Sequence, residues 1–223
     1  MELDNNAISS HMLDLGLGAL AHATHHAMYM SMDNDRWPEL SVLQAAHAAE
    51  ILIKARIAQE NPLLIFEKLP KNSTNGPSLN MDNLYRHGRT TQYSALPDKL
   101  LSTTGNTLSN REKFDEFGCI RNSIQHFLPK DGLRYDDLAL EFIYEVVDPF
   151  INECWGLHAC NYYEDIDGAE YLLDALITRG IYFNVSSEMA ESGAWVELNW
   201  PDSNPDYKTE MEKRVCEVLQ KQL

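Results

Sequence analysis

The 223-residue sequence has no run of about 18 apolar residues, so it predicts no membrane-spanning helix and no membrane partner. It also has no basic segment ahead of an apolar stretch near residue 1, which argues against a secretory signal. None of its four cysteines belongs to a Cys-x-x-Cys pair, which disfavours a disulfide framework and a cysteine-rich zinc site. We therefore expect a cytoplasmic protein with reduced thiols.

Basic side chains are scarce as well. The sequence has 18 Lys and Arg against 34 Asp and Glu, and its formal net charge is −16. This charge opposes general nucleic-acid binding, because phosphates are neutralised by Lys and Arg. The acidity is uneven: residues 134–223 carry 6 basic and 19 acidic side chains (−13), whereas residues 1–133 carry 12 and 15 (−3). Basic residues exceed acidic ones between 68 and 113, so a local basic patch is expected there.

The pattern of apolar residues predicts a mainly α fold. Four helices are expected, at residues 8–32, 39–60, 109–128 and 135–150. Ser109 and Glu112 have the spacing of a capping box at the start of the third helix. Pro129 disfavours helical geometry at the residue before it, so this helix should end at about Leu128. Four helices by residue 150 suggest an up-and-down bundle.

Two regions depart from this pattern. Residues 70–110 are rich in Pro, Asn, Ser, Thr and Gly, and predict an irregular insertion with one short helix. The region 153–223 predicts a small α+β unit, with a helix at 165–179, strands at 181–185 and 194–198, and a last helix near Pro205. We thus expect a helical bundle over residues 1–152 and an acidic C-terminal α+β region over 153–223.

The third predicted helix carries the segment Arg121-Asn122-Ser123-Ile124-Gln125-His126. Asn122 and His126 are four residues apart, so they are neighbours across one turn, roughly opposite the apolar residues. That apolar face is expected to consist of Phe117, Ile120, Ile124, Phe127 and Leu128. His126 lies in the last turn, where the helix dipole favours a protonated imidazole, and the Arg121 guanidinium suits phosphate oxygens. The group fits metal-independent transesterification of RNA, in which the ribose 2′-OH attacks its own phosphodiester.

Arg-Asn-x-x-x-His is the signature of the HEPN superfamily of ribonucleases, which includes toxins and phage-defence effectors, and this chain resembles that family over roughly residues 10–150. Residues 46–56 resemble the Ala-Glu-Leu-Leu-Leu-Lys-Ala helix of bacterial members, and residues 108–112 and Phe127 also fit. The resemblance implies Arg121 and His126 as the catalytic pair, with Asn122 helping to orient it. It further implies an RNA substrate, a homodimer with two facing motifs, and an antitoxin or sensor protein as a further partner. Leu128 stands where the branch controlled by adenylylation has Tyr, so that control does not carry over.

Other side chains are candidates for supporting roles. Glu50 and Lys54 share one face of the second predicted helix, and either support the active site or form a solvated ion pair. RNA-binding candidates in and near the basic stretch are Lys68, Lys71, Arg86, Arg89 and Arg111. His22, His25 and His26 lack a further ligand type, so no metal site is expected, and no cofactor is implied.

The alternative is a non-catalytic helical module that binds a protein or nucleotide partner. The charge of −16 favours this alternative, because it disfavours RNA docking. On that reading Arg121 only packs along the edge of the core, and His126 is an ordinary exposed side chain.

Overall fold

The computed structural model describes residues 5–29, 31–70, 81–164, 169–192, 195, 198–201 and 204–221. Most of these residues are helical, which confirms the mainly α prediction. The helices are α1 (Asn5–Met28), α2 (Trp37–Glu60), α3 (Met81–His87), α4 (Leu96–Thr104), α5 (Arg111–His126), α6 (Tyr135–Phe142), α7 (Asp148–Trp155), α8 (Ala169–Thr178), α9 (Ser187–Glu191) and α10 (Pro205–Gln220). Short elements are the 3-10 turns η1 (Pro62–Ile65), η2 (Tyr93–Ala95) and η4 (Ala159–Asn161), the π-helical turn η3 (Ile143–Val147), and strands β1 (Phe66–Lys68) and β2 (Arg89–Thr90).

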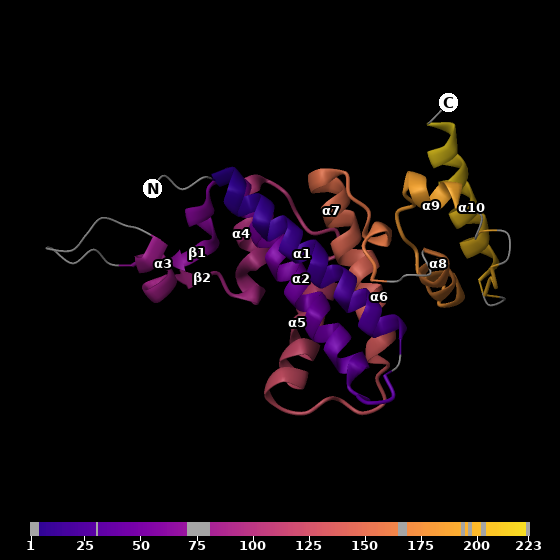
Figure 1. Cartoon of the computed structure of the whole chain (residues 1–223), viewed down its shortest axis with the longest axis horizontal. Coiled ribbons are helices and arrows are strands. Elements are labelled where there is room, and N and C mark those ends of the chain that lie inside the picture. Colours follow the sequence, from indigo (N-terminus) through magenta and orange to yellow (C-terminus); the bar gives the residue numbers. More distant parts are fainter. Residues whose placement is uncertain are drawn as a thin grey trace, which may run out of the picture.

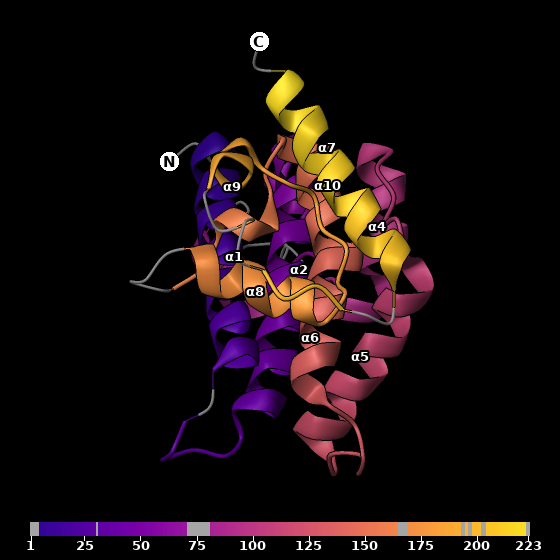
Figure 2. The same ribbon diagram turned by 90° about the vertical axis from the view of Figure 1, so that its right-hand side faces the viewer.

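Helices α1 and α2 form a hairpin at the centre of the molecule, with α5 and α6 alongside them (Figures 1 and 2). Helix α2 is buried on nearly all sides, and its alanines allow close approach by its neighbours. Gly16 of α1 shows how close: a Cβ atom on it would lie 2.7 Å from Cγ of Leu52. Within the described ranges, no helix has both the length and the apolar character that a membrane crossing requires.

The fourth predicted helix is longer than expected and is interrupted. It runs from Tyr135 to Trp155 through α6, η3 and α7, and η3 is a wider, π-helical turn. Pro149 has no N–H, so it cannot bond to the carbonyl of Glu145 four residues earlier. The Ser109 hydroxyl donates to that carbonyl instead, at 3.1 Å.

The start of α5 also differs from the prediction, which placed the capping residue at Ser109. The N-cap is Asn110, whose Oδ1 accepts from the N–H of Lys113 at 3.0 Å, and not Ser109. The end of α5 also differs from the prediction, because Phe127 leaves helical geometry (φ −143°, ψ −96°). Phe127 and Leu128 are therefore 90% and 64% exposed and do not extend the apolar face, which was expected to include them.

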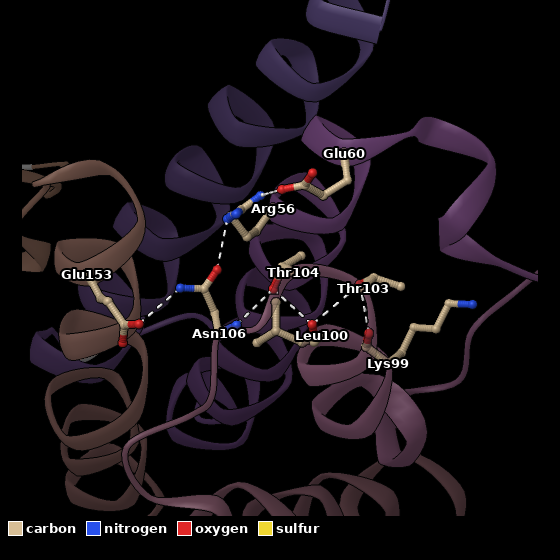
Figure 3. Close-up of polar contacts among 8 residues, drawn as sticks. All are labelled: Arg56, Glu60, Lys99, Leu100, Thr103, Thr104, Asn106 and Glu153. Carbon is tan, nitrogen blue, oxygen red and sulfur yellow. Dashed lines mark hydrogen bonds and ion pairs between the residues drawn. The ribbon is translucent and has the colours of Figure 1, made fainter.

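The segment before α5 is held against two other helices by a polar network (Figure 3). Arg56 Nε of α2 donates to Oδ1 of Asn106 at 3.0 Å, and Nδ2 of Asn106 donates to Glu153 of α7 at 2.9 Å. Gly105 precedes this residue at φ 78°, a left-handed conformation that ends α4. The network fixes where the chain enters α5.

The predicted insertion at 70–110 is more regular than expected. Its described part contains α3 and α4, two helices where one was predicted, and β2 pairs antiparallel with β1. Strands of two and three residues carry too little alternation to be found in a sequence. Residues 71–80, including the candidate Lys71, lie outside the described residues.

The strand predicted at 181–185 is wrong, although the chain there is extended. Ile181, Phe183 and Val185 are buried in alternation, but side chains and not a second strand bond to the backbone. Tyr207 Oη donates to the carbonyl of Ile181 at 2.7 Å, and the N–H of Asn184 donates to Asp148 at 2.9 Å. Of the strand predicted at 194–198, only Trp195 and Leu198 are described, and neither lies in a strand. The C-terminal region is thus helical and not α+β in its described part.

The C-terminal helices α8 to α10 lie together at one end of the molecule, opposite β1, β2 and α3 (Figure 1). The predicted boundary at residue 152 lies within α7. Residues on both sides of it, such as Phe142, Ile143, Phe183 and Tyr207, belong to one cluster of buried side chains. The tail therefore shares the core of the bundle.

Candidate functional site

A polar pocket of about 420 Å³ lies beside the middle of α5. Three segments that are distant in sequence line it: Glu50 of α2, residues 90–94 around η2, and one face of α5. The α5 residues are Asp115, Gly118, Cys119, Arg121 and Asn122. Two of the three residues predicted as catalytic, Arg121 and Asn122, thus share a pocket with Glu50, predicted to support them.

Arg121 is half-buried at this pocket, and the contacts of its guanidinium with described residues are made to neutral groups. Nη1 donates to Oδ1 of Asn122 at 2.9 Å, and Cζ lies 5.9 Å from the centre of the Tyr93 ring, within cation–π range. The sequence contains nine arginines, and the other eight each form an ion pair with Asp or Glu. Arg121 forms none with any carboxylate that the structure describes. In a protein of charge −16, this arginine is available to an anion.

Tyr93 forms the support beneath Arg121. Its ring stacks on Phe114, with centroids 4.2 Å apart and planes at 3°, and its hydroxyl donates to the Phe114 carbonyl at 3.4 Å. Burial raises the pKa of Tyr93 well above its ordinary value, so the phenol stays neutral. Gly118 permits this packing, because a Cβ atom there would lie 2.7 Å from Cε1 of the ring.

Glu50, which lines the pocket, forms a partly buried ion pair with Lys54. Lys54 Nζ donates to Oε1 of Glu50 at 2.6 Å and to Oγ1 of Thr90 at 3.3 Å. The Lys54 side chain is 9% exposed and that of Glu50 is 22% exposed. Lys54 therefore neutralises Glu50 and links α2 to β2, and it does not line the pocket itself.

His126 does not join this group. It lies one turn beyond Asn122 at the end of α5, exposed to solvent and absent from the pocket lining. The large apolar side chains of Phe127 and Leu128, which follow it, are also exposed. One chain thus places the arginine at the pocket and the histidine on the adjoining surface.

Most of the candidates for RNA binding are occupied by acidic partners. Arg86 pairs with Asp82, Arg89 with Glu67, and Arg111 with both Asp98 and Asp115. Lys68 is exposed at the end of β1. Among the candidates that the structure describes, these side chains therefore do not form the free basic patch that the local surplus of Lys and Arg predicted.

The histidines of α1 pack against aromatic rings and an acid. The rings of His22 and His26 lie 4.3 Å apart, His26 packs on Trp37, and Nδ1 of His22 lies 3.1 Å from Glu164. Burial, followed by the charges of His22 and His25, lowers the pKa of His26. Among the described residues, no group of three or more His, Cys, Asp or Glu is arranged to hold a metal ion.

The wall formed by residues 90–94 is the part of the site that the sequence did not reveal. Gln92 and Ser94 lie in the stretch interpreted as irregular, far from Arg121 in sequence. One signal was present: Gly118 inside an otherwise regular helix indicates the close approach of another group. The partner it admits is Tyr93.

Comparisons of the chain with protein-family models, with curated proteins and with solved structures found no match.

Proposed function

We propose that this protein is a metal-independent endoribonuclease of the HEPN type that cuts RNA by attack of the 2′-OH. The observation that carries the proposal is Arg121, half-buried at a pocket, hydrogen-bonded to Asn122 and without an acidic partner among the described residues. A guanidinium in that state is suited to bind a phosphate through two parallel N–H···O bonds. The Arg-Asn-x-x-x-His resemblance, the helical pair α1 and α2, and the position of the motif on α5 support the same conclusion.

The proposed reaction conserves atoms and charge. The ribose 2′-oxygen forms a bond to phosphorus while its proton passes to a base, and the bond from phosphorus to the 5′-oxygen breaks as an acid protonates that oxygen. The products are a 2′,3′-cyclic phosphate and a 5′-hydroxyl. The Arg121 guanidinium stabilises the charge on the phosphorane oxygens, and His126 serves as the acid–base group.

The exposed His126 favours a composite site in a homodimer, as the family resemblance implies. In one chain it lies outside the pocket that Arg121 and Asn122 line. The neighbouring side chains of Phe127 and Leu128 are 90% and 64% exposed, and apolar groups of this size favour burial in an interface. A second copy placed there would bring a second motif to the first. A toxin or phage-defence role in the cytoplasm, with an antitoxin or sensor as partner, is part of the same proposal.

The test is cleavage of a mixed RNA pool by purified protein in EDTA. We expect cleavage that leaves 2′,3′-cyclic phosphate ends, and a loss of at least about 100-fold in Arg121→Ala and in His126→Ala. Electrostatic stabilisation by Arg121 and acid–base catalysis by His126 each contribute at least about that factor. Arg36→Ala and His47→Ala are matched controls, since Arg36 has a 66% exposed side chain, His47 is exposed, and neither lines the pocket. Cleavage is compared only among variants whose melting temperatures equal that of wild type.

The other outcomes are equally informative. Loss of cleavage on chelation would reject the metal-independent mechanism. Equal cleavage by wild type and both motif variants would assign the activity to another site. If neither RNA cleavage nor RNA binding responds to the two substitutions, the protein is better described as a helical interaction module.

A further inference from the structure

We propose that the pocket beside Arg121 binds the base of one unpaired nucleotide, with Gln92 and Ser94 recognising its edge while Arg121 holds the adjacent phosphate. This inference rests on the proposed ribonuclease function for its RNA substrate, but it concerns a different set of side chains. It names what the pocket recognises, which the Arg-Asn-x-x-x-His motif does not determine.

The pocket has the size of a single small ligand. Its volume of about 420 Å³ lies near the lower end of small-molecule sites, which span about 300–1,000 Å³. A paired base cannot enter such a pocket, because its edge is already bonded and its neighbours are stacked upon it. Sequence-specific proteins accordingly read RNA mostly at unpaired, splayed-out bases. We infer that the substrate is single-stranded at the bound nucleotide.

Gln92 and Ser94 supply the hydrogen-bonding groups for a base edge. Both are exposed, both line the pocket, and neither side chain bonds to any residue that the structure describes. Gln92 adopts an extended backbone (φ −73°, ψ 155°) before η2, and its amide does not cap that turn. A glutamine amide offers donors and an acceptor side by side, as a base edge does, and a serine hydroxyl offers either role.

The charges around the pocket also fit a nucleotide. Asp115 would repel a phosphate, but Arg111 Nε lies 2.8 Å from its Oδ2, and Lys54 neutralises Glu50 in the same way. Arg111 also pairs with Asp98, which does not line the pocket, and Arg121 is the cation among the lining residues. The Tyr93 ring is buried against Phe114 and supports Arg121. In this proposal the base is therefore recognised by polar side chains.

The experiment measures nucleotide binding and does not depend on cleavage. The full chain, labelled with ¹⁵N, is titrated by NMR with the four nucleoside 3′-monophosphates and with inorganic phosphate. We expect at least one nucleotide to bind about tenfold more tightly than phosphate, which corresponds to one or two good hydrogen bonds. Gln92→Leu and Ser94→Ala should reduce that ratio to about threefold or less. Gln59→Leu, at an exposed glutamine near the end of α2, should leave the ratio unchanged.

Arg121→Ala should weaken phosphate and nucleotides alike, because it removes the shared phosphate contact. The inference is overturned if all four nucleotides bind no more tightly than phosphate, or if Gln92→Leu has the same ratio as wild type at an unchanged melting temperature. Cleavage of a single-stranded RNA of mixed sequence separates the two proposals. RNA cleavage without any base preference would contradict this inference, and the proposed ribonuclease function would stand. Selective nucleotide binding by a protein that cuts no RNA removes the ribonuclease and leaves a nucleotide site.

Discussion

Gly118→Ala perturbs Arg121 from below without removing any group that contacts RNA in the proposed site. The added Cβ atom would lie 2.7 Å from Cε1 and 3.1 Å from Cδ1 of Tyr93. The Tyr93 ring has little freedom to move, because it stacks on Phe114 with centroids 4.2 Å apart. The ring must therefore shift, and the guanidinium 5.9 Å above it loses its support.

The size of the effect follows from two opposing contributions. Replacing Gly by Ala inside a helix adds about 1 kcal/mol of stability, whereas overpacking a filled site removes about 1–3 kcal/mol. Gly18, inside α1, provides the matched control, because a Cβ atom on it would meet nothing within 4 Å. The helix contribution cancels between the two variants, so their difference measures the steric conflict alone. For a protein of this size 1 kcal/mol changes the melting temperature by about 2–4 °C.

Circular dichroism and RNA cleavage in EDTA test this reasoning together. We expect Gly18→Ala to melt about 2–4 °C above wild type, and Gly118→Ala to melt about 2–12 °C below Gly18→Ala. Cleavage, measured below both melting temperatures, should fall only in Gly118→Ala. Equal stabilisation by both substitutions would refute the close contact with Tyr93. A destabilised Gly118→Ala with wild-type cleavage would show that Tyr93 does not position Arg121.

Two further predictions concern buried charges. Burial raises the pKa of Asp148 to about 6, although its carboxylate accepts bonds from the N–H groups of Ala159 and Asn184. Its contribution to stability is therefore complete below about pH 4 and is lost as the pH rises through 6. Urea unfolding measures the free energy of unfolding between pH 4 and 7, and wild type should lose up to about 3 kcal/mol relative to Asp148→Asn over that range. The same pH dependence of this free energy in both proteins would contradict the raised pKa of Asp148. Lys54→Met should lower the free energy of unfolding by about 2–3 kcal/mol, because it leaves Glu50 partly buried without its cation, and adding Glu50→Leu should restore most of the loss. A harmless single substitution would mean that the pair contributes nothing.

The long helices could be predicted because each carries its own signal. Helix α2 was expected at 39–60 and lies at Trp37–Glu60, since its apolar residues and Pro62 are local features. Gly180 ends α8 as expected, with φ 66°. The π-helical turn η3 was not predicted: Pro149 is a local signal, but the hydroxyl that bonds to the Glu145 carbonyl comes from the distant Ser109.

The errors arise where distant groups decide the outcome. The segment 181–185, predicted as a strand, is extended and buries Ile181 and Phe183, but the sequence does not tell whether a strand or side chains will bond to its backbone. The motif on α5 likewise indicated Arg121 and Asn122, whose neighbours in the helix are fixed by its geometry. Gln92 is distant from them in sequence, and only the tertiary structure brings it to the same pocket. The separation of His126 from the pocket depends on where α5 ends.

The internal pairing of the arginines has a consequence for how the protein responds to salt. Eight arginines are already neutralised by neighbouring acids, so few counterions would be released when RNA binds. Each phosphate contacted in a single strand changes the logarithm of affinity by about −0.7 per logarithm of salt concentration. An RNA held through Arg121 at one nucleotide should therefore show a slope near −1, where a basic groove along the backbone would give several times that value. The protein would then bind RNA with an affinity set by a few local contacts and only weakly sensitive to ionic strength.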